Sequence, residues 1–228
     1  GRCLARYTPG RMDYEQGGVS VEVQVMRSFD CALWRITNNS TLEVSVPVKF
    51  GGVSGRKFSR NGDLGVDPPD CFDLKSEYCE GNVLSLSGDD VIVSYGDKER
   101  KEVCLSVPAC ERSVSALNIY EGVVRLDPGE SRIMAYFPDG KNPRESLESL
   151  VARAEEERRA LVSSLVISTP DEWLNPVGGA IAVAADGIWG GNAWLHGAIG
   201  WRTPHLGWRG AYCGDALGWH DRALMHFE

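Results

Sequence analysis

A long alternation of apolar and polar residues constrains the fold of this chain more than any other feature. Residues 19–25 and 42–48 carry an apolar side chain at every second position. Further strand-like runs lie at 31–37, 83–86, 91–95, 103–107, 114–124 and 132–137. Turn-forming clusters such as Asn38-Asn39-Ser40 and Asp127-Pro128-Gly129-Glu130 separate them. Short strands with one apolar face and turns between them predict an antiparallel β-sandwich from about Gly18 to Pro138.

The pattern changes to helical spacing after residue 141. Asn142-Pro143 predicts a helix start, with an N-cap residue followed by proline at the first helical position. Apolar residues then recur at helical spacing as far as Leu165, and at ~1.5 Å per residue this helix would be about 34 Å long. Thr169-Pro170-Asp171-Glu172 predicts a second helix start, and Pro176 a restart. We therefore expect a β-sandwich at 1–140, a linker helix at 141–167 and an α-helical part at 168–228.

One segment interrupts the strands. Residues 51–81 are rich in Gly, Pro and Asp and show little periodicity. A connection of this length is usually functional or disordered. Its aspartates, Asp63, Asp67, Asp70 and Asp73, lack the spacing of an EF-hand calcium loop, so we interpret them as solvated turn residues. The alternative is that this loop helps to build the functional site.

Charge and cysteine content exclude several classes of protein. The net charge is −8, and no run of Lys and Arg resembles a nucleic-acid footprint. No apolar run approaches the roughly 20 residues that a membrane span needs. The seven cysteines lack C-x-x-C spacing. Cys71 with Cys79 and Cys104 with Cys110 are two possible disulfides, but the pattern favours mostly buried thiols.

The C-terminal quarter has a different composition from the rest. Six of the seven tryptophans and all four histidines lie between Trp173 and Glu228. After Val166 there is no Lys, and the arginines are Arg202, Arg209 and Arg222. A sugar site needs a flat apolar platform for the C–H face of the ring and forked polar groups for its hydroxyls. Tryptophan and arginine supply these two features, so this composition favours carbohydrate recognition.

A helical wheel over the last segment places several of these residues on one face. At 100° per residue, Trp208, Trp219 and Arg222 fall within about 60° of Asp215. We therefore predict one continuous inner helix that lines a cavity. The predicted sugar-binding residues are Trp201, Arg202, His205, Trp208, Arg209, Tyr212, Asp215, Trp219 and Arg222. The alternative is a helix buried in a larger α-domain, with its charges paired.

No catalytic residue can be assigned from this pattern. Asp215 and Asp221 are a candidate carboxylate pair for glycoside hydrolysis, but six residues on one helix direct them about 120° apart. We expect Asp215 to bind sugar hydroxyls or to orient Arg222, and keep it as a less favoured catalytic candidate. The four histidines, His196, His205, His220 and His226, together with Cys213 lack the paired spacing of zinc sites. We predict no metal and no cofactor.

Several motifs resemble a known bacterial family. They are Arg35-Ile36-Thr37-Asn38, Phe50-Gly51-Gly52-Val53-Ser54-Gly55, Gly200-Trp201-Arg202-Thr203-Pro204-His205-Leu206-Gly207-Trp208-Arg209-Gly210-Ala211-Tyr212 and Gly218-Trp219-His220-Asp221-Arg222-Ala223. They are similar to domain of unknown function 4450, and the organisation is similar to glycoside hydrolases and phosphorylases with an N-terminal β-sandwich and an (α/α)6 barrel. The resemblance implies the N-terminal portion of a carbohydrate-active enzyme, a glycoside hydrolase that acts on a polysaccharide.

The same resemblance sets further expectations. It implies that residues 168–228 form the first helices of an (α/α)6-type barrel, and that their partners are an oligo- or polysaccharide and the rest of the polypeptide beyond Glu228. In such barrels the catalytic carboxylates come from later helices, so we expect this chain to be inactive alone. We expect a secreted or periplasmic location, with the signal peptide removed. The alternatives are a non-catalytic carbohydrate-binding module, which needs aromatics on the sandwich beyond Trp34, and a structural or interaction domain.

Overall fold

The structure is a computed structural model that describes residues 1–51, 79–95, 102–107, 111–114, 119–196 and 208–228. The chain divides into two compact units. Unit 1 comprises Gly1–Ala5 and Asp13–Val151, and unit 2 comprises Arg6–Met12 and Ala152–Glu228. Most of the predicted 51–81 connection, with Asp63, Asp67, Asp70 and Asp73, lies outside the described residues. The three-part division at 140 and 167 stays a prediction.

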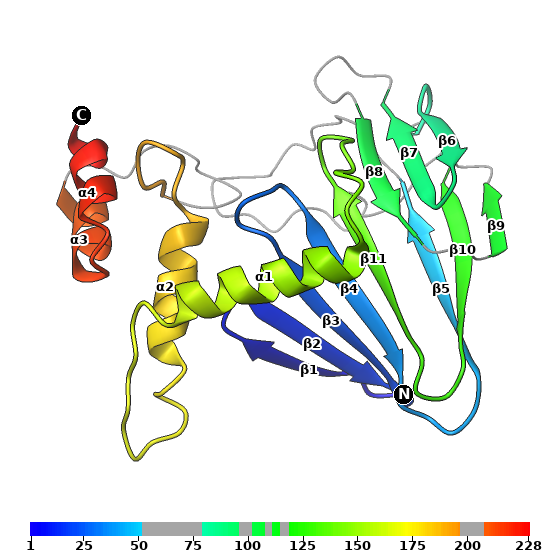
Figure 1. The fold of residues 1–228 in the computed structure, drawn as a ribbon, viewed down its shortest axis with the longest axis horizontal. Helices are drawn as coiled ribbons and strands as arrows, with labels where there is room; N and C mark the ends of the chain where they lie inside the picture. The colour runs from blue at the N-terminus through cyan, green and yellow to red at the C-terminus, as the bar shows by residue number, and fades with distance from the viewer. Residues whose placement is uncertain (52–78, 96–101, 108–110, 115–118, 197–207) are drawn as a thin grey trace, which may run out of the picture. The chain divides into compact units, whose positions relative to one another are not determined.

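Eleven strands and four helices are present in the described residues (Figure 1). The strands are β1 (Leu4–Thr8), β2 (Arg11–Gln16), β3 (Val19–Val25), β4 (Ala32–Asn38), β5 (Val44–Phe50), β6 (Val83–Ser87), β7 (Asp90–Ser94), β8 (Glu102–Ser106), β9 (Glu111–Val114), β10 (Tyr120–Leu126) and β11 (Ser131–Phe137). The helices are α1 (Leu147–Val162), α2 (Val177–Gly187), α3 (Trp208–Ala216) and α4 (His220–Phe227).

The strands form two sheets whose apolar faces share one core. The larger sheet has the order β1-β2-β3-β4-β11-β8-β7-β6, and the smaller has the order β5-β10-β9. Ile36, Leu105 and Met134 of the larger sheet pack in one cluster with Tyr120 and Leu126 of the smaller one. The chain alternates apolar and polar residues, so each sheet buries one face against the other. This confirms the predicted antiparallel sandwich followed by helices.

Asn38 holds the corner where the chain passes from one sheet to the other. Its side chain is fully buried and donates to the carbonyl oxygens of Leu42 at 2.8 Å and Leu126 at 3.0 Å. Its own Oδ1 accepts the backbone N–H and the hydroxyl of Ser40. A buried amide with its groups satisfied fixes the turn geometry. The predicted turn at Asn38-Asn39-Ser40 is therefore confirmed, and its physical basis is this amide.

The first strand of the sandwich was predicted too late, at about Gly18, although the predicted sandwich domain begins at residue 1. The structure adds the neighbouring strands β1 and β2 ahead of residue 18. Pro9 and Gly10 separate them, and Gly10 has a φ of +76°, a conformation that favours glycine. The Pro-Gly pair was the available sequence signal, but the strands beside it do not alternate clearly.

The predicted start of the linker helix at Asn142-Pro143 is wrong. Helix α1 begins at Leu147, and Ser146 Oγ accepts the N–H of Ser149 at 3.1 Å. Asn142 Nδ2 and Arg144 Nη1 instead donate to the buried Asp90 carboxylate, at 3.0 and 2.6 Å. Arg144 has a φ of +63°, which a helix does not allow. The two polar partners of Asp90 therefore hold this segment out of the helix.

In unit 2, helix α2 buries its smallest residues and exposes its larger ones. A Cβ at Gly178 would lie 2.5 Å from the Leu165 carbonyl oxygen, and one at Gly179 would lie 2.6 Å from Val162 Cγ1. The opposite face leaves Val177 40% and Ile181 43% exposed. Helix α2 begins after Pro176, as predicted from that proline. The start predicted at Thr169 is wrong, because residues 172–176 form turns.

The single C-terminal helix predicted by the wheel is also wrong. Helix α3 ends at Ala216 and α4 begins at His220. Gly218 has a φ of +75°, Trp219 N–H donates to the Gly214 carbonyl at 2.7 Å, and Gly218 N–H donates to that of Asp215 at 3.0 Å. This pair of bonds around a left-handed glycine is a Schellman motif, which ends a helix. The side chains of α3 and α4 therefore point in directions that a helical wheel for one continuous helix does not predict.

The five described cysteines are thiols. Cys31, Cys79 and Cys104 are buried, Cys213 is half-buried, and Cys3 is exposed. Burial, with a smaller effect of Asp90, raises the pKa of Cys104 to about 11. Cys71 and Cys110 lie outside the described residues. Among the helices that the structure describes, none is long and apolar enough to cross a membrane.

Glu155 on α1 binds two arginines of the same helix. Arg158 donates to it twice, at 2.7 and 2.9 Å, and Arg159 donates once, at 2.7 Å. Arg158 also donates to the Pro9 carbonyl at 2.9 Å, so this ion pair holds the β1–β2 turn within unit 2. The hydrogen bonds from Arg158, with a smaller contribution from Arg159, lower the pKa of Glu155 from 4.5 to about 2.

We expect Glu155→Gln to reduce the free energy of unfolding at pH 7 but to have little effect near pH 2. A carboxylate whose folded pKa is depressed stabilises the fold above its unfolded pKa, and this contribution is lost as pH falls toward the folded value. Because these i,i+3 and i,i+4 pairs are partly screened by solvent, the expected loss is about 1 kcal/mol at pH 7. Urea unfolding of both proteins at pH 7, 4 and 2.5 measures it. An equal difference at all three pH values would contradict the assignment.

Candidate functional site

The structure describes part of the predicted sugar site. Trp201, Arg202 and His205 lie outside the described residues. Trp208 and Arg209 belong to α3, but only their backbone is described. The four others have described side chains: Tyr212 and Asp215 on α3, Trp219 at the N-cap of α4 and Arg222 on α4.

Arg222 lies at the centre of the described cluster. Its Nη1 donates to Asp186 Oδ1 at 2.9 Å, and its Cζ lies 4.8 Å from the ring centre of Trp219 and 5.2 Å from that of Trp189. The Arg222 and Asp186 side chains are 21% and 14% exposed. A weakly hydrated guanidinium suits this partly dry position, because it pairs with a carboxylate and stacks on aromatic faces together. Trp219 and Arg222, two of the predicted sugar-binding residues, are therefore in contact.

The expected pairing of Asp215 with Arg222 is wrong. Asp215 Oδ1 accepts a hydrogen bond from His220 Nδ1 at 2.6 Å, while Arg222 is bound to Asp186. The break at Gly218 causes this change, because it brings the first residue of α4 back to the end of α3. A carboxylate on Nδ1 fixes the imidazole tautomer and directs Nε2 away from the pair. Both side chains are largely exposed to solvent.

These residues border an open pocket of about 340 Å³. It is lined by Gly218, Trp219, His220, Asp221 and Arg222. One aromatic ring, one imidazole, one carboxylate and one guanidinium thus border this open pocket. A ring face with directed donors and acceptors beside it is a chemistry suited to a polyhydroxylated ligand.

Trp194 supports this pocket from within unit 2. It is 1% exposed, and its indole Nε1 donates to the Ala185 carbonyl at 3.0 Å. Its ring lies 4.6 Å from that of Trp189 in an edge-on arrangement, and its backbone N–H donates to His226 Nδ1 at 3.2 Å. A Cβ at Gly214 would overlap the Trp194 ring. Glycine on α3 therefore makes room for the tryptophan that positions the Arg222 cluster.

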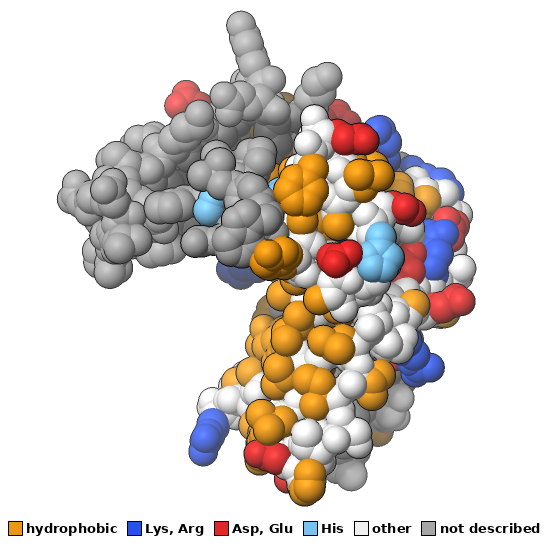
Figure 2. All heavy atoms as spheres, turned by 90° about the vertical axis from the view of Figure 1, so that its left-hand side faces the viewer, with side chains coloured by type: hydrophobic (Ala, Val, Ile, Leu, Met, Phe, Trp, Pro, Cys, Tyr) orange, Lys and Arg blue, Asp and Glu red, His pale blue; other side chains and the backbone are white. Residues whose placement is uncertain are grey.

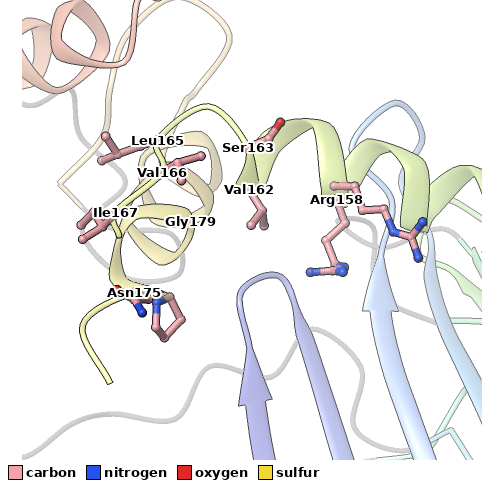
Figure 3. Close-up of a pocket in the computed structure, with 10 residues that line it drawn as sticks. Arg158, Val162, Ser163, Leu165, Val166, Ile167, Asn175 and Gly179 are labelled. Carbon is pink, nitrogen blue, oxygen red and sulfur yellow. The ribbon is translucent and has the colours of Figure 1, made fainter. Parts of the chain in front are cut away.

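A second pocket in unit 2 has a different character (Figure 3). It measures about 300 Å³ and lies where the end of α1 meets the start of α2. Its lining is mostly aliphatic: Arg158, Arg159, Val162, Ser163, Leu165, Val166, Ile167, Asn175, Pro176 and Gly179. None of the predicted site residues borders it. Its two arginines are both bound to Glu155.

Sequence reasoning missed three residues of the described cluster: Asp186, Trp189 and His220. Asp186 is the one charged residue in the otherwise apolar helix α2. A lone carboxylate on such a helix needs a buried partner, and this was the available signal. His220 lies within the motif that contains Trp219 and Arg222, but a continuous helix would have separated it from Asp215. Nothing in the sequence pattern pairs Trp189 with Arg222.

In the part of the chain that the structure describes, no group of three or more His, Cys, Asp and Glu residues is arranged to hold a metal ion. The fold and the cluster together define a class of protein: an antiparallel β-sandwich followed by helices that carry an open pocket with one tryptophan and one arginine in its described lining. The family follows from the sequence. The chain belongs to the family described as domain of unknown function (DUF4450), whose model matches residues 2–117.

Among solved structures, the chain is similar to one described as a polysaccharide lyase. The TM-score is 0.34 and the sequence identity is 14%, over 68% of this chain and 23% of the lyase. The chain thus spans less than a quarter of that protein. A search of the curated proteins finds no match.

Proposed function

We propose that this chain is the N-terminal portion of a carbohydrate-active enzyme, a glycoside hydrolase that acts on a polysaccharide. In this proposal unit 2 contributes the sugar-binding pocket, and its helices are the first of an (α/α)6-type barrel. The predicted residues that the structure does not describe, Trp201, Arg202 and His205, complete the same site. The β-sandwich and the linking helix are its scaffold.

One observation carries the proposal. Trp219 is held beside Arg222 and next to the His220–Asp215 pair, on the wall of one open pocket. The ion pair with Asp186 and the stack with Trp189 hold the guanidinium in place, so a sugar would meet a rigid group. Pre-organised side chains lose little entropy on binding. An ion pair with a purely structural role would not need the exposed His220–Asp215 pair and an open pocket beside it.

The described residues favour binding over catalysis in this part of the protein. Hydrolysis of a glycosidic bond needs two carboxyl groups roughly 5–9.5 Å apart across the bond. Asp186 is bound to Arg222 and Asp215 is bound to His220, so Asp221 is the single carboxylate among the described residues that line the pocket. We therefore propose that the acid and base lie outside the described residues and that Asp215 acts in binding. A non-catalytic carbohydrate-binding role is the second candidate, and the same two hydrogen bonds favour it.

The expected partners and location follow from the proposed substrate. The ligand is an oligo- or polysaccharide, and the other partner is the remainder of the polypeptide beyond Glu228. We propose a secreted or periplasmic location, where the protein would meet an extracellular polysaccharide. Detection of the native protein in culture medium or a periplasmic extract tests this location.

We expect Trp219→Ala to weaken oligosaccharide binding by at least tenfold, because it removes the aromatic platform. Isothermal titration with disaccharides and hexasaccharides from β-glucan, galactomannan and glycogen measures the affinity. Trp173→Ala, which removes an exposed tryptophan outside the pocket, is the matched control and should bind a disaccharide like the wild type. If the wild type and Trp219→Ala bound a sugar with equal affinity, this pocket would be excluded as the sugar-binding site. Absence of binding to the whole panel would remove the proposed function.

A further inference from the structure

His220 and Asp215 form a hydrogen-bonded pair at the surface of unit 2. The distance from His220 Nδ1 to Asp215 Oδ1 is 2.6 Å, and the two side chains are 72% and 66% exposed. Figure 2 faces the side of α3 and α4 and shows a histidine and acidic side chains together at the surface. Gly218 N–H donates to the Asp215 carbonyl at 3.0 Å in the turn that ends α3. This turn holds His220 next to Asp215 before any ligand binds.

The stability of the two helices does not account for this pair. An exposed ion pair contributes little to the free energy of folding. Asp215 is the penultimate residue of α3, and His220 is the first residue of α4. A helix favours positive charge at its C-terminus and negative charge at its N-terminus, so each residue lies at the helix end that disfavours its charge. The reason for the pair therefore lies outside the helices themselves.

His220 belongs to the lining of the Trp219 pocket, whereas Asp215 is not among the described residues that line it. Because Nδ1 is bound to Asp215, the second ring nitrogen, Nε2, is the polar atom that the imidazole can present to the pocket. Within the part of the chain that the structure describes, Nε2 has no hydrogen-bond partner. A carboxylate on Nδ1–H keeps the proton of the neutral ring on that nitrogen, which makes Nε2 an acceptor.

The other polar groups of the pocket complement this acceptor. Asp221 adds a carboxylate, which only accepts, and Arg222 adds a guanidinium, which only donates and spends one N–H on Asp186. The ring of Trp219 supplies an apolar surface beside them. A matching ligand needs hydroxyl groups for His220 and Asp221, an oxygen acceptor for Arg222 and an apolar face. A sugar ring has all three, because its hydroxyls both donate and accept.

We propose that His220 binds a sugar hydroxyl through Nε2 and that Asp215 is its positioning residue, which does not touch the sugar. The inference rests on the proposed function and divides the work between the two members of the pair. Asp215 holds the orientation of the ring and keeps its proton on Nδ1. Without Asp215 the ring could turn and carry its proton on Nε2, which then could not accept the hydroxyl.

A double-mutant cycle on disaccharide binding tests these two roles. The proteins are the wild type, His220→Ala, Asp215→Ala and the double variant, and the probe is a β-glucan or galactomannan disaccharide in isothermal titration. We expect each single variant to lose about fivefold in affinity. The double variant should bind like His220→Ala, because Asp215 then has nothing to position. Asp215→Asn, whose amide oxygen can still accept the Nδ1–H, should retain part of the affinity.

The tautomer of His220 gives a readout that needs no sugar. In a long-range ¹H–¹⁵N spectrum of the histidine rings at about pH 8.5, where imidazoles are neutral, wild-type His220 should carry its proton on Nδ1. Asp215→Ala should return part of the proton to Nε2, and His220→Ala assigns the signals. Addition of the disaccharide should shift the Nε2 resonance of the wild type. Because both side chains are exposed, thermal unfolding of the variants should match that of the wild type.

Each other outcome has a distinct meaning. Equal affinity of the wild type and His220→Ala, with weaker binding by Trp219→Ala, would overturn the role of His220 while the pocket stands. Additive losses in the double variant would show that Asp215 contacts the sugar itself and would overturn its positioning role. A wild-type ring with its proton on Nε2 would overturn the inference whatever the protein binds. If the wild type binds no glycan, the proposed function fails and this inference fails with it.

Discussion

Replacing Trp194 with alanine is expected to reduce the free energy of unfolding of unit 2 by about 3–5 kcal/mol. The ring is almost completely buried, it packs against Ala211 and Ala223, and its indole N–H is bound to the Ala185 carbonyl. Truncation would leave a large cavity between α2, α3 and α4 and deprive that carbonyl of a hydrogen bond. Urea unfolding followed by tryptophan fluorescence and near-ultraviolet circular dichroism measures the change.

Two further variants make this prediction specific. Gly214→Ala should also destabilise, because its Cβ would overlap the Trp194 ring and force either the helix or the ring to move. Trp173→Ala removes a tryptophan of the same size from an exposed turn and should change stability by less than about 0.5 kcal/mol. If Trp194→Ala were as stable as Trp173→Ala, the packing described around Trp194 would be wrong.

Replacing Arg222 with methionine is expected to destabilise unit 2 by about 2–3 kcal/mol. In this variant the Asp186 carboxylate would stay largely buried but would lose the Arg222 guanidinium that pairs with it. The variant would also lose the contacts of the guanidinium with the rings of Trp189 and Trp219. Loss of a cation–π contact adds roughly 0.5–1 kcal/mol where the cation is partly exposed. Arg222→Lys should recover only part of the loss, because an ammonium cannot form the planar fork.

A double-mutant cycle separates the ion pair from the stacking. The variant Asp186→Asn with Arg222→Met should be less destabilised than the sum of the two single variants, because the uncompensated charge is then absent. Additive effects would show that Arg222 and Asp186 do not interact in solution. The same proteins, titrated with the disaccharides, show whether the orientation of Trp219 depends on Arg222.

The sandwich could be predicted from sequence because its signal is local and repeated. In β3 and β5 each strand alternates by itself, and Asn38 with its neighbours marks the turn between β4 and β5. The hairpin of β1 and β2 was missed because its residues are mostly exposed and carry no apolar stripe. Pro9-Gly10 was a turn signal, but a turn alone does not identify the strands beside it.

The helical part was harder because single residues decide where its helices end. Asn142-Pro143 has the composition of a helix start, yet the tertiary bonds to Asp90 hold that segment out of the helix. Gly218 ends α3 by adopting a left-handed conformation. The helical wheel assumed that one helix continued through this glycine. Trp219 and Arg222, both named from the sequence, are in contact. Their partners were not named, because Asp186 and Trp189 come from a segment more than 30 residues away in sequence.

The most direct test of the proposed function is to observe which tryptophan side chains contact a bound sugar. Seven tryptophans give seven indole N–H signals in a ¹H–¹⁵N spectrum, and substitution variants assign each one. Titration with a disaccharide that binds should shift the signal of Trp219, while Trp34 in the sandwich should not move. Perturbation of Trp34 with an unchanged Trp219 would place the sugar on the β-sandwich and contradict the account.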